Sequence, residues 1–219
     1  MTMLRLSFHL LVLSFLSHGA YAAENCPDSS HVLVQRLDKF PASNGCSKPP
    51  GISVGGEEDF TYCCDRHDAC YSTCGISKNY CEQDFGKCME ELCNTVFTSN
   101  PQCTSAAQVY QMGTTMFGGN GFQDLQNDFC ECIPKSIVKK HYTKLLDKLY
   151  REHTDKSPEE ISEMTSRLLD KTGDSVRKLG SLFYKISKKY DSVIQHEGPR
   201  VGVDPPRPKK MPRAPKPEL

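Results

Sequence analysis

The sequence predicts a mainly α-helical, disulfide-rich protein, and three observations support this fold class. The chain contains twelve cysteines, an even number, and all of them follow an N-terminal segment with the features of a secretory signal peptide. Two consecutive segments repeat cysteine at the spacing of one helix face. The C-terminal part contains no cysteine and repeats apolar residues at helical spacing.

The N-terminal 23 residues indicate export from the cell. One early positive charge, Arg5, precedes an apolar run over residues 6–16, and an A-x-A cleavage pattern follows at residues 20–23. The run is too short to span a bilayer, and no later segment is apolar enough to do so. We therefore expect a secreted, extracellular protein with no transmembrane segment, whose cysteines are oxidised.

Composition and charge both change after the last cysteine. Residues 24–132 carry six Lys or Arg against fifteen Asp or Glu, a formal −9, whereas residues 133–219 carry twenty against twelve, a formal +8. The net charge of zero thus conceals an acidic part and a basic part. After the signal peptide (1–23) we expect a cysteine-rich domain over 24–134, a basic amphipathic helical extension over 135–197 and a disordered Pro/Lys-rich tail over 198–219.

The first cysteine-bearing segment, residues 61–75, is expected to be a helix. At 100° per residue, Cys63, Cys70 and Cys74 form one stripe with His67 close beside it. Cys64 lies on an adjacent flank, together with Asp68.

The second segment, residues 79–97, repeats the pattern. Cys81, Phe85, Cys88 and Leu92 share one stripe, and Gly75 lies in a short turn between the two segments. Two antiparallel helices that face each other through cysteine stripes would be cross-linked along their length. Such a rigid pair suits a side chain that must keep a fixed position.

The extension has its own helical signals. Residues 136–150 and 175–194 repeat apolar residues at helical spacing, and Ser157 begins a capping box that Glu160 completes. The segment 175–194 is basic on its other face. Two interpretations stay open for it: packing on its own domain, or contact with an anionic membrane surface or acidic partner.

His67 has three interpretations. A zinc site is disfavoured because the adjacent Cys63 and Cys64 point in different directions, and a purely structural histidine is the second possibility. The favoured interpretation is a general base, which needs a carboxylate to fix its tautomer, and Glu82, Asp84 and Asp68 all lie nearby.

Asp68 is a candidate calcium ligand. Upstream, residues 43–56 (SNGCSKPPGISVGG) contain four glycines and two prolines around Cys46. If Cys46 pairs with Cys64, this loop is held over Asp68, and its carbonyl oxygens are ligands that calcium prefers.

The stretch CCDRHDACYSTC resembles the C-C-x-x-H-D-x-C signature of secreted phospholipases A2. The surrounding pattern is similar to the group XII branch, with the resemblance extending over about residues 26–132. Its motifs are N-G-C at 44–46, H-D-x-C-Y-x-T-C-G at 67–75, S-K-N-x-C-x-x-x-F-x-x-C at 77–88, and C-x-C at 130–132 preceded by Gln126.

The resemblance implies a calcium-dependent enzyme that hydrolyses the sn-2 ester of phospholipids through a water activated by His67. Calcium, the one cofactor implied, would polarise the ester carbonyl and the phosphate. By the same resemblance Asp68 would bind it, together with the backbone oxygens of Gly45, Ser47 and Pro49. The family usually has glycine where Ser47 and Pro49 stand, so the loop departs from its pattern.

The resemblance also implies the partner of the histidine and part of the disulfide framework. The carboxylate falls at Glu82, where the family has aspartate directly after a cysteine, with Asp84 as second choice; the commoner group I/II position holds Ile133. The implied bridges are Cys46–Cys64, Cys63–Cys88 and Cys70–Cys81, and the pairing of the other six cysteines stays open.

A phospholipid membrane surface is the implied partner, contacted peripherally by a monomer, with no role for nucleic acid. The alternative function is a catalytically weak or inactive phospholipase A2-like module that binds lipid or protein. The substituted loop and Glu82 would suit that alternative.

Overall fold

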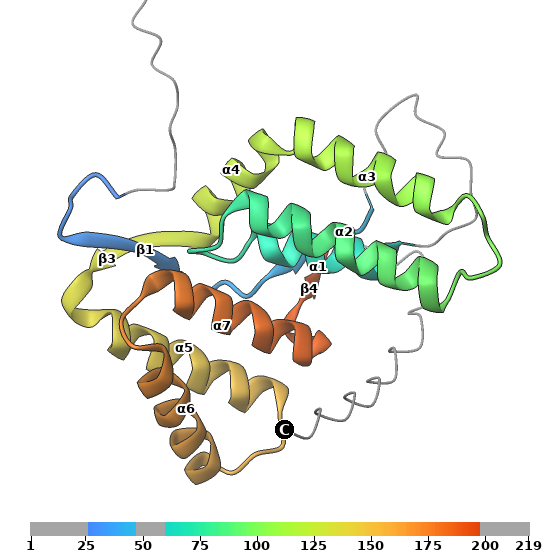
Figure 1. The fold of residues 1–219 in the computed structure, drawn as a ribbon. Helices are drawn as coiled ribbons and strands as arrows, with labels where there is room; N and C mark the ends of the chain where they lie inside the picture. Colours follow the sequence, from blue (N-terminus) through green and yellow to red (C-terminus); the bar gives the residue numbers. More distant parts are fainter. Residues whose placement is uncertain (1–25, 47–59, 198–219) are drawn as a thin grey trace, which may run out of the picture.

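The computed structural model describes residues 26–46 and 60–197 of the 219-residue chain. Helices dominate these residues, and the strands are short (Figure 1). The elements are β1 (His31–Gln35), β2 (Ala42–Ser43), α1 (Thr61–Tyr71), α2 (Lys78–Thr95), α3 (Cys103–Phe117), α4 (Gly119–Phe129), β3 (Cys130–Pro134), η1 (Lys135–Ile137), α5 (Val138–His153), α6 (Pro158–Thr172), α7 (Val176–Lys189), η2 (Asp191–Val193) and β4 (Gln195–His196).

Helices α1 and α2 form the predicted cross-linked pair. The earlier cysteine of α1 bonds the later cysteine of α2 (Cys63–Cys88), and the later bonds the earlier (Cys70–Cys81), so the helices run antiparallel. The turn between them contains Gly75 at φ 81°, a left-handed conformation that glycine adopts without strain. The predicted mainly α, disulfide-rich fold is therefore confirmed.

All twelve cysteines are paired. The three bridges implied by the resemblance are all present: Cys63–Cys88 and Cys70–Cys81 within the helix pair, and Cys46–Cys64 between α1 and the preceding loop. The six cysteines that the sequence left open form the remaining three bridges: Cys26–Cys132, Cys74–Cys130 and Cys93–Cys103.

Two small sheets join segments that are distant in the chain. Strand β1 pairs antiparallel with β3, with Leu33 opposite Cys132. Strand β2 pairs parallel with β4 near the end of the described chain, where the Glu197 amide donates to the Ser43 carbonyl at 2.8 Å. The C-terminal segment therefore returns to the loop that precedes α1.

Helices α5, α6 and α7 share one apolar core with the N-terminal strand. Val34 of β1 and Phe40 pack in the same cluster as Leu145 and Phe183. The apolar face of α7 is buried in this core. Of the two interpretations of the basic helix, its apolar residues therefore fit packing on its own domain. The boundary between a cysteine-rich domain ending at residue 134 and an extension beginning at residue 135 stays a prediction.

Several boundaries differ from the expected ones. Helix α1 ends at Tyr71 rather than residue 75, and α7 ends at Lys189, followed by η2. The capping box is as expected: Ser157 Oγ accepts from the Glu160 amide, and the Glu160 side chain accepts from the Ser157 amide. Helices α3 and α4 and all four strands had no counterpart in the sequence analysis.

Some predictions fall on residues that the structure does not describe. They are the signal peptide (1–23), the tail (198–219), and the loop residues Ser47 and Pro49. Within the described ranges, the helices are too short or too polar to cross a membrane.

Candidate active site

His67 lies in the middle of α1, on the face turned toward α2. Its side chain is only 6% exposed, and its ring packs between Tyr71, one turn along α1, and Phe85 of α2, at centroid distances of 4.2 and 4.5 Å. These two aromatic rings fix the plane of the imidazole. The cysteine stripe that predicted the helix pair also brings His67 to the interface between the two helices.

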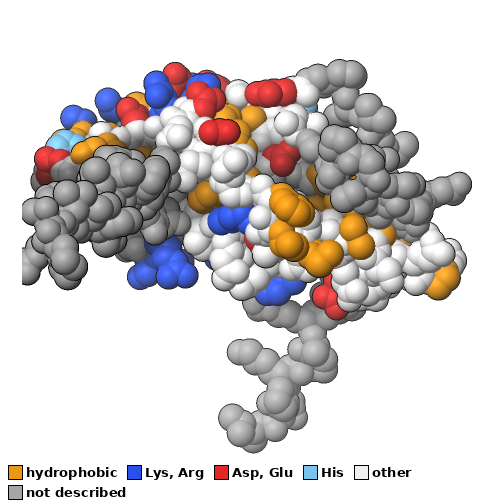
Figure 2. All heavy atoms as spheres, turned by 90° about the horizontal axis from the view of Figure 1, so that it is seen from above, with side chains coloured by type: hydrophobic (Ala, Val, Ile, Leu, Met, Phe, Trp, Pro, Cys, Tyr) orange, Lys and Arg blue, Asp and Glu red, His pale blue; other side chains and the backbone are white. Residues whose placement is uncertain are grey.

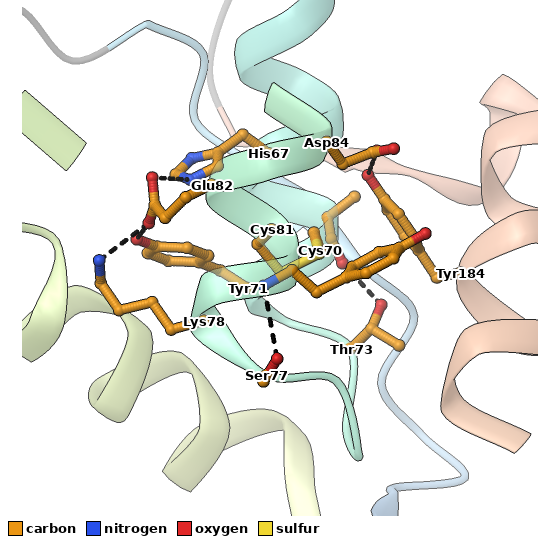
Figure 3. The surroundings of a disulfide bond; sticks show 12 residues. His67, Cys70, Tyr71, Thr73, Ser77, Lys78, Cys81, Glu82, Asp84 and Tyr184 are labelled. Atoms are coloured by element: carbon orange, nitrogen blue, oxygen red, sulfur yellow. Dashed lines mark hydrogen bonds and ion pairs between the residues drawn. A yellow bond between two sulfur atoms is a disulfide. The ribbon is translucent and has the colours of Figure 1, made fainter. Parts of the chain in front are cut away.

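Glu82 of α2 faces His67 across this interface (Figure 3). His67 Nε2 and Glu82 Oε2 are 3.4 Å apart, and the Glu82 side chain is 5% exposed. The separation exceeds the roughly 2.7–3.2 Å of good N–H···O bonds, as catalytic pairs often do without substrate. A carboxylate at Nε2 favours the tautomer with the proton on that nitrogen, which leaves Nδ1 as the acceptor.

Glu82 is held by three further donors, one from each of α1, α2 and α3. The Tyr71 hydroxyl donates to Oε1, the Thr114 hydroxyl of α3 donates to Oε2, and Lys78 Nζ lies 2.9 Å from Oε1. Burial opposes ionisation of Glu82, but the nearby His67 ring and the bonds from Thr114, Tyr71 and Lys78 outweigh it and lower its pKa to about 2. Glu82 is therefore a carboxylate at neutral pH.

Sequence reasoning did not identify these supporting residues. Tyr71 follows His67 by four positions and Lys78 precedes Glu82 by four, so both lie on the interface side of their helices, a signal that helical spacing contains. Thr114 is 32 positions from Glu82 and belongs to a helix that was not anticipated. No periodicity within α1 or α2 points to it.

Asp84, the second choice for the histidine's partner, lies on the other flank of α2 (Figure 3). The Tyr184 hydroxyl donates to its Oδ2 at 2.7 Å, and Lys188 Nζ binds both carboxylate oxygens at 2.8 and 3.0 Å. Asp84 therefore fastens α7 to α2 and makes no contact with His67. Glu82 and not Asp84 is the carboxylate that the structure brings to the histidine.

Asp68 points away from α2 toward the chain before α1. Its Oδ2 accepts from Ser43 Oγ at 3.1 Å and from the Asn44 amide at 3.2 Å. Burial raises the pKa of Asp68 to about 6, with a smaller contribution from the nearby Asp65 carboxylate. The negative charge of Asp68 is thus destabilised by these surroundings, and a cation beside it would stabilise it.

With this geometry established, comparison with known proteins identifies the family. A family model described as "Group XII secretory phospholipase A2 precursor" matches residues 12–139, more than half of the chain. The chain belongs to the group XII secretory phospholipase A2 family.

Individual relatives agree with this assignment. Human "Group XIIA secretory phospholipase A2" is 31% identical over 115 residues, 49% of this chain and 61% of the relative. Mouse "Group XIIB secretory phospholipase A2-like protein" is 32% identical over 107 residues (43% and 55%), and "Conodipine-P3" of Conus purpurascens is 39% identical over 64 residues (28% and 35%).

The match spans about three-fifths of the group XIIA relatives' length. Helices α6 and α7 lie beyond the region that the family model covers. No solved structure gives a significant match.

In this group XII family member, the residues around Asp68 fit a calcium ion. The set combines one partly buried carboxylate with the backbone of a loop that Cys46–Cys64 ties to α1, and calcium takes carboxylate and carbonyl oxygens. Gly45 has φ 79°, which a residue with a side chain would adopt only with strain. The described residues contain no cluster of three His, Cys, Asp or Glu that could hold a metal ion.

Proposed function

We propose that this protein is a secreted, calcium-dependent phospholipase A2 that hydrolyses the sn-2 ester of phospholipids. The observation that carries the proposal is the buried His67–Glu82 pair with Asp68 next to the histidine. The family assignment supports the same reaction class. The signal-peptide pattern and the family's secretory members support an extracellular location, where the protein would act as a monomer on a phospholipid membrane surface.

His67 is the general base of the proposed reaction. Its Nδ1 accepts a proton from a water molecule, which attacks the ester carbonyl carbon, while the Nε2 proton stays directed at Glu82. The Glu82 carboxylate stabilises the imidazolium that forms. The imidazolium then returns its proton to the departing alkoxide oxygen, and the products are a fatty acid and a lysophospholipid.

Calcium, when bound, supplies a Lewis acid for the ester carbonyl and the phosphate. The proposed ligands are the Asp68 carboxylate and the backbone oxygens of Gly45, Ser47 and Pro49. Ser47 and Pro49 can serve through their carbonyl groups, since neither substitution removes a backbone oxygen.

Glu82 replaces the aspartate of the family pattern, and its surroundings compensate for the longer side chain. One additional methylene gives glutamate another rotatable bond, which by itself would loosen the contact with His67. Tyr71, Lys78 and Thr114 bind both carboxylate oxygens and restrict that rotation. The replacement is therefore compatible with a catalytic pair.

The test is fatty-acid release from phospholipid vesicles by the wild type and by His67→Gln. Loss of the general base should reduce the rate by about 10²–10⁴-fold, and a calcium chelator should abolish wild-type activity. His31→Gln is the matched control, because the His31 ring is partly exposed and bonds Asp28 and Ser30 rather than any residue of the candidate site. Its rate should equal that of the wild type.

Absent or calcium-independent hydrolysis by the fully oxidised wild type would contradict the proposal. The chain would then be a phospholipase A2-like module that binds lipid or protein. Calcium titration by calorimetry separates the two cases further, because an incompetent loop binds no calcium at millimolar concentration.

A further inference from the structure

An uncharged segment runs through the middle of this highly charged chain. Residues 92–123 contain no Asp, Glu, Lys, Arg or His over 32 consecutive positions, although charged residues make up 25% of the sequence. At that average, a segment of this length would contain eight charged residues. It includes all of α3 and the first part of α4.

The same segment exposes apolar side chains to solvent. Five of the six exposed large hydrophobic residues in the described part of the chain lie in it: Val96, Val109, Met112, Met116 and Phe117. Met112, Met116 and Phe117 are 58, 65 and 76% exposed. We call Val109, Met112, Met116 and Phe117 the α3 surface; Figure 2 looks onto this side and shows hydrophobic side chains gathered there with Lys or Arg beside them.

The other side of α3 belongs to the candidate active site. Thr114 Oγ1 donates to the Glu82 carboxylate, and Gln111 Nε2 donates to the Glu82 carbonyl at 3.2 Å. Lys78 Nζ, which binds Glu82, also binds the carbonyl oxygens of Thr114 and Thr115 at 2.9 and 3.1 Å. Met112, Met116 and Phe117 therefore lie within one helical turn of residues that contact the catalytic carboxylate.

The basic helix α7 offers no comparable apolar surface. Leu179, Phe183 and Ile186 are buried in the core or at its edge; Lys178, Lys185 and Lys189 are exposed, whereas Lys188 binds Asp84. Contact of α7 with a membrane would therefore be electrostatic and sensitive to salt. Contact through α3 would bury apolar side chains without removing any charge from water.

We propose that the α3 surface is the part of the protein that enters the phospholipid surface, an inference that rests on the proposed function. Exposed apolar side chains that form a cluster commonly mark a binding site, whereas single scattered ones are normal on a protein surface. A lipid surface fits as the occupant because the α3 surface is uncharged and adjoins the site that would take the lipid. Insertion here brings the active site to the membrane without requiring anionic lipid.

The test uses a variant with Met112→Ser, Met116→Ser and Phe117→Ser in the full chain. We expect its partitioning onto phosphatidylcholine vesicles, measured by sedimentation, to fall by at least about tenfold, since three apolar side chains no longer enter the lipid. Wild-type binding should be the same at low and high salt. Ile137→Ser is the matched control, because Ile137 is 43% exposed but lies in η1, outside the α3 surface.

Hydrolysis of a short-chain phospholipid below its micelle concentration separates this inference from the proposed function. The triple variant should hydrolyse that dissolved substrate at the wild-type rate and lose activity only on vesicles. If the wild type hydrolyses neither substrate, the proposed function fails, and the sedimentation result still decides whether the α3 surface binds lipid.

Three outcomes would overturn the inference. The first is vesicle binding by the triple variant equal to that of Ile137→Ser. The second is self-association of the wild type that the substitutions abolish while vesicle binding persists, which would assign the surface to a second copy. The third is a lowered melting temperature with vesicle binding retained, which would mean that another segment of the chain covers α3; Phe117→Ser alone provides a milder variant for the same comparison.

Discussion

The helix pair α1–α2 and the helices α5–α7 are stabilised in different ways. The pair carries two disulfides across its interface and buries a histidine and a glutamate there. Helices α5–α7 contain no cysteine and pack through a large apolar cluster that includes Leu145, Leu149 and Phe183. Buried polar groups cost stability, and cross-links offset that cost by restricting the unfolded chain. A polar pair such as His67 and Glu82 can therefore be buried where covalent bonds replace part of the apolar packing.

The two regions meet along α7. Tyr184 and Lys188 bind Asp84 of α2, and the Tyr184 hydroxyl oxygen also lies 3.1 Å from the carbonyl oxygen of Arg66, the residue before His67. Gly180 lets α7 pass the end of α1, because a side chain at this position would collide with the Cys74 carbonyl. The apolar region thus supports the helix pair from the side opposite to the Glu82 network.

The largest effect on stability is expected from Leu145→Ala in the apolar region. Removing this fully buried side chain should lower the free energy of unfolding by about 2–5 kcal/mol. Hydrolysis per folded molecule should not change, since the residue does not contact the site. Denaturant titration and the vesicle assay measure the two quantities; Leu182→Ala, at the partly buried edge of the same cluster, should cost less. Equal losses of activity in Leu145→Ala and His67→Gln would refute the division into two regions.

Removing a disulfide from the helix pair should lower both the free energy of unfolding and the rate of hydrolysis. Cys70→Ala with Cys81→Ala opens a bridge of sequence separation 11 and should cost about 2–4 kcal/mol. Activity should also fall, because Glu82 directly follows Cys81. The control is Cys93→Ala with Cys103→Ala, whose separation of 10 gives a similar entropic effect away from His67. If both pairs reduce hydrolysis of a dissolved substrate equally, the cross-link has no special role in positioning the site.

The smallest effect is expected where the two regions meet. Tyr184→Phe removes one hydrogen bond to a charged acceptor and should cost about 1.5–3 kcal/mol at most, less where Lys188 still binds Asp84. Tyr190→Phe, in the same segment and without a described hydroxyl bond, should change stability little. Thermal unfolding of the two variants is the measurement, and an identical melting temperature would show that the Tyr184 hydroxyl does not fasten α7.

The helix pair could be predicted from the sequence because its cysteines recur at the spacing of one helix face in two consecutive segments. Cys63, Cys70, Cys81 and Cys88 repeat at helical spacing, and the disulfides between them place His67 opposite Glu82. Local periodicity predicted the two facing helices, whereas the disulfide pairing and the choice of Glu82 before Asp84 rested on the resemblance to the group XII signature.

The remaining parts of the site could not be predicted because they depend on contacts between distant segments. Thr114 reaches Glu82 from a helix that contains three threonines and no charged residue, so it lacks the usual charged face. Strands β2 and β4 have two residues each, too few for alternation to be visible. Helical spacing alone leaves both Glu82 and Asp84 as partners for the histidine, and in the structure α7 binds Asp84 while Glu82 faces His67.

The pairing of β2 with β4 has a practical consequence for anyone producing this protein. Its composition suggests cutting the chain after the last cysteine to obtain a compact enzyme. That cut would remove the partner strand of Ser43, whose hydroxyl contacts Asp68, together with the tyrosine that binds Asp84. An inactive fragment ending near residue 134 would therefore reflect lost support for the site rather than a defect in its chemistry, and assays should retain the residues after position 134.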